Sequence, residues 1–307
     1  GGTVIVASSP RSIETMGTEL RLRKVESGLT DWLSRHGVSI DDGVILDERQ
    51  AAFPLPVVRK VGAYEFRDMQ FVDYPYLLDI RDDGLNSEHP ITQGLPNLTV
   101  AWASPLMVED RAGIVQQTLL TSSDKAWLSD ETNVMPSLDD SGQSSFSGTG
   151  KPRQRATVGV VLQGEFTSFF DEVPEASPTT APDSEVEAPS STLISKSPSS
   201  TRLIVVSSND FASDQVLSGI IAASGTQYFG PLELLMNAVD WALEDSSLMN
   251  IRSRAHFNRT LPALPQNTQA SIEYGNYAAA LLFLLLTYGL WRLLRRRREA
   301  QLREVLL

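Results

Sequence analysis

The sequence has no cysteine and only three histidines among its 307 residues. Without cysteine there are no disulfide bonds, no thiolate metal sites and no cysteine nucleophile. The histidines, His36, His89 and His256, are far apart and lack the spacing of metal ligands, so we expect no metal site. The glycine-rich and serine-centred motifs of nucleotide-binding proteins and hydrolases are also missing, and we expect neither a cofactor nor an enzymatic activity.

The chain has little positive charge over most of its length. Its formal net charge is −12, which argues against a nucleic-acid partner because nucleic acids repel an acidic surface. The adjacent carboxylates at 41–42, 82–83 and 139–140 lie in predicted turns, and we interpret them as solvated side chains. The residues 47–49 follow a predicted strand, where a surface ion pair is the simplest interpretation.

One long apolar stretch lies near the C-terminus. Residues 277–291 carry no charge, and extending the stretch to 272–294 gives a length typical of a transmembrane helix. The alternative is a buried helix at the end of a soluble domain. Aromatic residues near both ends and a basic run after the stretch favour the membrane. The predicted membrane anchor comprises Tyr277, Trp291, Arg292, Arg295, Arg296, Arg297 and Arg298.

The distribution of arginine predicts the orientation of this helix. Residues 292–307 hold six Arg and two Glu, and such basic segments stay in the cytoplasm. We therefore expect an extracytoplasmic domain at 1–255, a stalk at 256–271, the span at 272–294 and a basic cytoplasmic tail at 295–307. The expected location is the inner (cytoplasmic) membrane, where the tail can also contact anionic lipid. Because the chain starts with Gly-Gly rather than a signal sequence, we expect a fragment of a longer polypeptide or a chain whose signal was removed.

The pattern of apolar runs predicts an α/β fold. Residues 3–7 and 44–46 read as buried strands around a helix at 25–36 that Gly37 ends, which indicates a βαβ unit. A strand at 202–206 and helices at 211–223 and 231–243 extend the series. We expect a parallel-type sheet with flanking helices. Residues 171–201, rich in Ser, Pro and acidic side chains, are expected to form a disordered loop.

Two of the predicted strands end alike. Both TVIVASSP (3–10) and RLIVVSSND (202–210) run from apolar residues into Ser-Ser and a turn. In a parallel sheet such ends share the carboxyl edge, where ligands bind. This predicts a ligand site for a glycan or a small molecule, and the alternative is that these residues only cap helices. The candidate ligand-binding residues are Ser8, Ser9, Ser208, Asn209 and Asp210.

The order of segments resembles a known family. The stretches that carry the resemblance are VILDERQAAFPLPV (44–57), YPYLLDIRDDGLNSEHPITQGLPNLTVAWASPL (74–106), LLTSSDKAWL (119–128), RLIVVSSNDFASDQ (202–215) and NAVDWALEDSSLMNIRSR (237–254). They are similar to the gliding-motility-associated ABC-type transport auxiliary proteins, the extracytoplasmic component of ABC-2-type exporters. The resemblance implies a flavodoxin-like or glutamine-amidotransferase-like domain, with an ABC permease and an ATPase as partners.

Three functions remain open at this point. The first is a non-enzymatic, membrane-anchored auxiliary subunit of an ABC-type transport system. The second is a membrane-tethered module that binds glycans of the cell envelope through the Ser-Ser edge. The third is a tethered hydrolase, which would require an activated nucleophile that the sequence does not reveal.

Overall fold

The computed structural model describes residues 2–16, 19–61, 64–136, 146, 150–170, 194–243 and 266–305. The chain divides into two compact units, Gly1–Phe257 and Asn258–Leu307, and each is described by itself. The predicted loop at 171–201 lies outside these residues up to position 193, and the predicted stalk at 256–271 lies outside them up to position 265.

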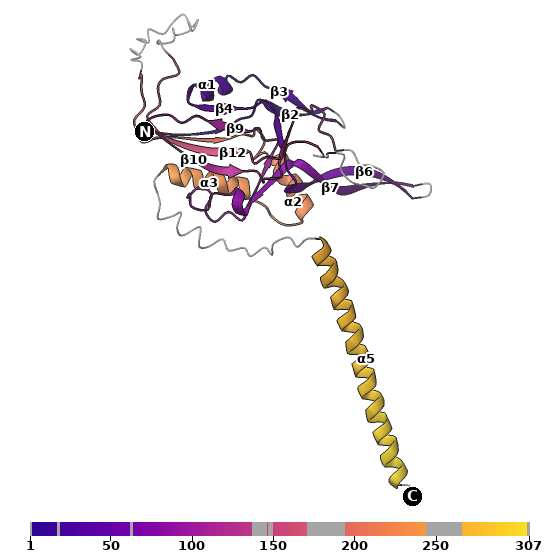
Figure 1. Cartoon of the computed structure of the whole chain (residues 1–307). Coiled ribbons are helices and arrows are strands. Elements are labelled where there is room, and N and C mark those ends of the chain that lie inside the picture. The colour runs from indigo at the N-terminus through magenta and orange to yellow at the C-terminus, as the bar shows by residue number, and fades with distance from the viewer. Residues whose placement is uncertain are drawn as a thin grey trace, which may run out of the picture. The chain divides into compact units, whose positions relative to one another are not determined.

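The largest sheet of the first unit has six strands within the described part of the chain (Figure 1). Its order is β1-β13-β12-β9-β4, and β10 pairs with β12 along its whole length. The pair β1–β13 is parallel, and the other described pairs of this sheet are antiparallel. The strands are β1 (Thr3–Ala7), β4 (Val38–Ile40), β9 (Leu106–Val108), β10 (Ile114–Thr121), β12 (Thr157–Gly164) and β13 (Thr201–Val206).

The predicted parallel, flavodoxin-like sheet is therefore wrong. Residues 44–46 do form a strand, but this strand, β5 (Val44–Leu46), pairs with β11 (Trp127–Ser129) in a separate antiparallel sheet. The expected βαβ unit with β1 does not form. The reason is that short apolar runs look the same in parallel strands and in antiparallel strands buried on both faces, so the sequence pattern does not determine strand direction.

Two further small sheets complete the first unit. The hairpin of β2 (Arg11–Met16) and β3 (Glu19–Lys24) follows β1 in the chain and precedes the first helix. A three-stranded sheet has the order β6-β7-β8, with β6 (Gln50–Val61), β7 (Tyr64–Arg81) and β8 (Asn97–Ala101). A short 3-10 helix, η1 (Asp82–Gly84), follows β7 directly.

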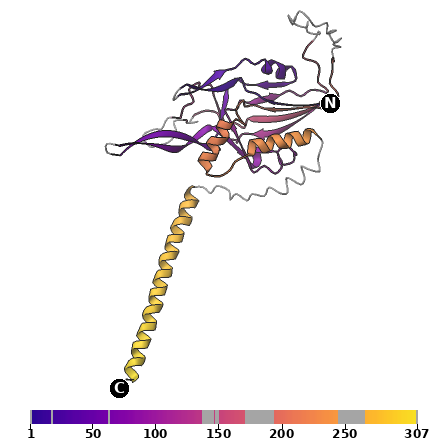
Figure 2. The ribbon, with the colours of Figure 1, turned by 180° about the vertical axis from the view of Figure 1, so that it is seen from behind.

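Helices cover both faces of the six-stranded sheet. Along β13, Leu203 and Val205 point to one face and Ile204 to the other, as expected for a strand. The first face packs against Leu33 of α1 (Leu29–Arg35), and the second packs against Leu234 of α3 (Gly230–Ala242) (Figures 1 and 2). Burial on both sides explains why this strand is almost wholly apolar.

The ends of the helices follow from local sequence. Gly37, at φ 86°, lies directly after α1 in the left-handed region that glycine favours, as the sequence predicted. The helix α2 (Asp214–Ser224) begins after Ser213, whose hydroxyl accepts a hydrogen bond from the Val216 N–H, and ends at Gly225 with φ 67°. The predicted start of this helix at residue 211 is therefore three residues early.

The second unit contains the helix α5 (Gln266–Val305), 40 residues long. The expected transmembrane helix at 272–294 is not supported, since no described helix is both long enough and apolar enough to cross a membrane. The run free of charge is residues 274–291, and a helix of this length extends about 27 Å, less than the roughly 30 Å of a hydrocarbon core.

Candidate functional site

The parallel pair β1–β13 brings the two Ser-Ser ends together. The Ser8 N–H donates to the Val206 carbonyl at 3.0 Å, which continues the ladder past the strand ends. One residue further, the Ser9 N–H donates to Asn209 Oδ1 at 3.0 Å, and Asn209 Nδ2 donates back to the Ser9 carbonyl at 2.9 Å. Four of the five predicted ligand-binding residues, Ser8, Ser9, Ser208 and Asn209, thus lie at one edge of the sheet.

The hydroxyl groups of Ser9 and Ser208 form hydrogen bonds inside the protein. Ser9 Oγ lies 3.1 Å from Ser104 Oγ and also accepts the Arg11 N–H. Ser208 Oγ donates to the Ala101 carbonyl at 2.5 Å and accepts the Asp210 N–H. Ser9 is 3% exposed and Ser208 is fully buried. The arrangement connects β1, β13 and β8, and the hydroxyls that a ligand would need serve these connections.

Asp210, the fifth predicted residue, is half-buried beside the hairpin β2–β3. Loss of solvation raises the pKa of its carboxyl group, and a hydrogen bond from the Ile13 backbone opposes the rise. Next to it, Asn209 Nδ2 also donates to the Arg11 carbonyl at 2.8 Å. The turn after β13 therefore holds the start of β2 in place.

A second polar cluster lies at the end of β5, where the sequence suggested a surface ion pair for residues 47–49. Asp47 is instead buried, at 2% exposure. Its carboxylate accepts the N–H and the hydroxyl of Ser123, each at 2.6 Å, and the Arg49 N–H at 2.9 Å. No local pattern in the sequence indicates this role of Ser123, because Asp47 and Ser123 are 76 positions apart.

The charged side chains around this cluster are paired with one another. Glu48 contacts Lys125 at 3.3 Å and Arg153 at 3.1 Å, and Arg153 also lies over the Trp127 ring. Asp83 accepts hydrogen bonds from Arg49 and Arg155. These two guanidinium groups, with Arg155 the stronger influence, lower the pKa of Asp83 to about 2. The ion pairs hold the segments around β5 together.

The histidines do not form a metal site in the described residues. His89 is buried against the Trp241 ring, with centroids 5.1 Å apart. Burial lowers its pKa and favours the neutral form. No group of three or more possible metal ligands gathers anywhere in the described ranges.

The residues of the predicted membrane anchor lie on α5. The Tyr277 hydroxyl donates to Glu273 Oε1 at 2.8 Å, one turn earlier, and the Arg295 guanidinium lies 5.4 Å from the Trp291 ring centroid. Arg292 is exposed on the same helix. The helix also includes Arg296, Arg297 and Arg298, whose side chains are not among those that the structure describes.

The feature that sequence reasoning missed is the hairpin of β6 and β7, which projects from the body of the first unit (Figures 1 and 2). The two strands pair from Gln50↔Leu78 out to Val61↔Tyr64, whereas β7 pairs with β8 only over Leu77–Arg81. In the outer part of the hairpin, the described strand pairing is therefore that of β6 and β7 with each other. Isolated two-stranded hairpins are marginal in water, so this projection is a candidate for contact with a partner.

One face of the hairpin carries exposed apolar side chains. The cross-strand pairs Pro54↔Phe71, Pro56↔Met69 and Val58↔Arg67 place alternate residues of both strands on the same face. Val58, Met69 and Phe71 are 59%, 49% and 46% exposed. We call Pro56, Val58, Met69 and Phe71 the hairpin stripe. On the opposite face, Leu55 and Val72 are buried at the base, whereas Tyr64 and Phe66 nearer the tip are 73% and 54% exposed.

The comparisons with known proteins identify the family. The model of the family described as "ABC-type uncharacterized transport system" matches residues 1–238, which is most of the chain and almost the whole described part of the first unit. No curated protein and no solved structure matches the chain. The matched region contains the six-stranded sheet, the Ser-Ser edge and the hairpin stripe. The chain therefore belongs to this family of auxiliary components of ABC-type transport systems.

Proposed function

We propose that the protein is a non-enzymatic subunit that binds the membrane-embedded part of its transport system through the hairpin stripe. Family membership supports the transport system as the setting. The single observation that carries the mode of action is the projecting hairpin with an apolar face. Exposed apolar patches of this kind mark surfaces that bind partners. The partners in the proposal are the permease, which the hairpin contacts, and the ATPase, which the permease binds.

The chemistry of the hairpin favours recognition through side chains rather than through an added strand. β6 is an edge strand of its sheet and contains Pro54 and Pro56, which lack the N–H that a further strand would need. Large flexible and aromatic side chains such as Met69 and Phe71 are typical anchors of protein interfaces. A partner that presents an apolar groove would bury the stripe without a change in the fold.

The buried polar clusters support a binding role. The hydrogen bonds of the Ser-Ser edge and of the pair Asp47–Ser123 join segments that are far apart in the sequence. Side chains used in this way stabilise the scaffold that carries the hairpin. The proposal of a non-enzymatic protein rests on this use and on the family.

We further propose that the first unit lies on the extracytoplasmic side of the cytoplasmic membrane, held there by the permease. The similarity of the segments at 44–57, 74–106 and 202–215 to extracytoplasmic components supports this side. Protease added to intact spheroplasts should cleave the first unit, whereas a cytoplasmic ATPase remains intact. Full protection of the first unit in spheroplasts, with cleavage after lysis, would place it on the other side.

Co-purification tests the proposed interaction. The protein, with an affinity tag in a surface loop, is purified in mild detergent from cells that express the permease and the ATPase. The variant Val58→Ser/Met69→Ser/Phe71→Ser should recover less than a tenth of the permease. The matched control Met107→Ser/Val115→Ser also removes exposed apolar side chains from strands, at 58% and 64% exposure, and should recover as much as the wild type. Equal recovery by all three proteins would refute the role of the hairpin.

A further inference from the structure

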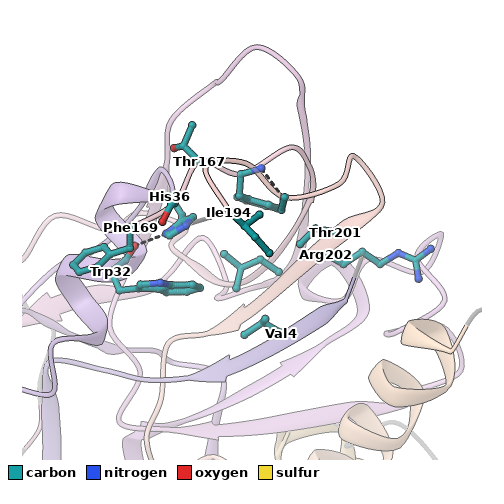
Figure 3. A pocket seen from close by; sticks show the side chains of 12 residues that line it. Val4, Trp32, His36, Thr167, Phe169, Ile194, Thr201 and Arg202 are labelled. Atoms are coloured by element: carbon teal, nitrogen blue, oxygen red, sulfur yellow. Dashed lines mark hydrogen bonds between the residues drawn. The ribbon is translucent and has the colours of Figure 1, made fainter. Parts of the chain in front are cut away.

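A cavity of about 230 Å³ lies on the α1 side of the six-stranded sheet, away from the hairpin (Figure 3). Its floor is formed by Val4 of β1 and Leu203 of β13, which are register partners and share one face. Trp32 and His36 of the α1 region form one wall, and Phe166 and Phe169 complete it. Most of the lining is therefore aromatic or aliphatic, as in sites that bind small apolar groups.

Backbone hydrogen bonds hold the segments around Phe166 and Phe169 in place. The Ser168 N–H donates to the Ser195 carbonyl at 2.8 Å, and the Ser197 N–H donates to the Phe166 carbonyl at 2.8 Å. Ser197 Oγ also accepts the Phe166 N–H at 2.9 Å. These bonds fix the two chain segments that carry Phe166 and Phe169, so the cavity is formed before any ligand arrives.

His36 supplies a buried polar atom beside the cavity. The residue is 7% exposed, and its ring lies 4.3 Å from the Trp32 ring and 5.7 Å from the Phe166 ring. Its Nδ1 lies 2.7 Å from the Trp32 carbonyl, which only accepts, so in the neutral ring Nδ1 carries the proton. Nε2 then carries a lone pair that can accept a hydrogen bond.

We propose that this cavity binds one aromatic ring that carries a hydrogen-bond donor, such as a para-hydroxyphenyl group. An apolar cavity of about 150 Å³ holds benzene in another protein, so the larger volume here fits a ring with a short substituent. The ring would pack among Trp32, Phe166 and Leu203, and its hydroxyl would donate to His36 Nε2. The group is supplied either by a free phenol or by a tyrosine side chain of an extended segment, and the site is independent of the hairpin stripe.

The test uses para-cresol and toluene, which differ by one hydroxyl group. Binding to the full chain is followed by NMR shifts of the methyl groups of Val4 and Leu203. We expect para-cresol to bind about tenfold more tightly than toluene, the effect of one hydrogen bond to a buried acceptor. The variant Val4→Phe adds a larger side chain at the floor of the cavity and should abolish binding, whereas Val115→Phe on β10 should leave it unchanged. Absence of shifts at millimolar para-cresol, or equal binding by Val4→Phe, would overturn the proposal.

Two further experiments test the hydrogen bond to His36 and the source of the aromatic ring. His36→Phe keeps a ring but removes the acceptor, so para-cresol should lose its tenfold advantage. If this variant fails to fold, the affinities of the wild type for para-cresol and toluene decide whether the hydrogen bond exists. Equal affinities for the two compounds refute it. A capped tripeptide with a central tyrosine distinguishes the sources. Tighter binding than para-cresol supports a side chain as the natural ligand, weaker binding supports a free phenol, and failure of both refutes the site.

Discussion

The carboxylate of Asp47 receives two hydrogen bonds from Ser123, one from the backbone N–H and one from the hydroxyl, each at 2.6 Å. Both residues are buried. The contact joins the end of β5 to the turn after β10 and so connects the small sheet β5–β11 to the six-stranded sheet. Short bonds from two donors to one carboxylate are among the stronger polar contacts in proteins, and we infer that this pair fixes the two sheets relative to each other.

Removal of the carboxylate should destabilise the first unit markedly. Asp47→Ala leaves the two Ser123 donors and the Arg49 N–H without an acceptor, and we expect a loss of about 3 kcal/mol in the free energy of unfolding. Ser123→Ala removes only the hydroxyl donor and should cost about 1 kcal/mol. Urea unfolding of both single variants and the double variant measures the coupling. Strict additivity of the two losses would contradict the account.

The titration of Asp83 tests the ion pairs beside this contact. Because Arg155 and Arg49 lower its pKa to about 2, its carboxyl resonance in NMR should titrate near pH 2. Its stabilising effect is present above the ordinary value of 3.8 and is lost as the pH falls through 2. Arg155→Gln should move the midpoint toward 3.8 but change the free energy of unfolding by less than about 1 kcal/mol, because the pair is exposed. Lys24→Gln, at the distant pair with Asp42, should leave the midpoint unchanged.

Asp210 should behave in the opposite way. Burial raises the pKa of its carboxyl group, so the folded state prefers the neutral acid and the charge at pH 7 costs stability. Asp210→Asn removes the charge but keeps an oxygen for the Ile13 N–H, and we expect it to melt at a higher temperature than the wild type at pH 7. The difference should shrink as the pH falls toward 3.8 and below. Asp214→Asn at the start of α2 is the control and should not raise the melting temperature.

Local features of the fold could be predicted from the sequence, but the pairing of strands could not. The strand at 3–7 and the glycine after α1 are confirmed, because both depend on neighbouring residues. The predicted partner of β1 was the strand at 44–46, whereas the real partner is Thr201–Val206, some 200 residues away. Such pairings depend on tertiary contacts that a single sequence does not encode locally.

The same difference separates the Ser-Ser edge from the hairpin stripe. The Ser-Ser edge was predictable because β1 and β13 form a parallel pair, so that equal sequence patterns end side by side. The hairpin stripe was not, because Val58, Met69 and Phe71 read as ordinary strand residues. Their exposure becomes evident only when the base of the hairpin is seen to be buried and the stripe to have no partner.

Site-specific photo-crosslinking tests the central claim most directly. A benzophenone amino acid replaces Met69 or Phe71 in the hairpin stripe, or Met107 or Val115 as exposed controls, in cells that contain the complete transport system. Irradiation should link positions 69 and 71 to the permease and leave the control positions free of that product. Equal yields from all four positions, or no permease adduct from 69 and 71 in an assembled system, would contradict a docking role for the hairpin.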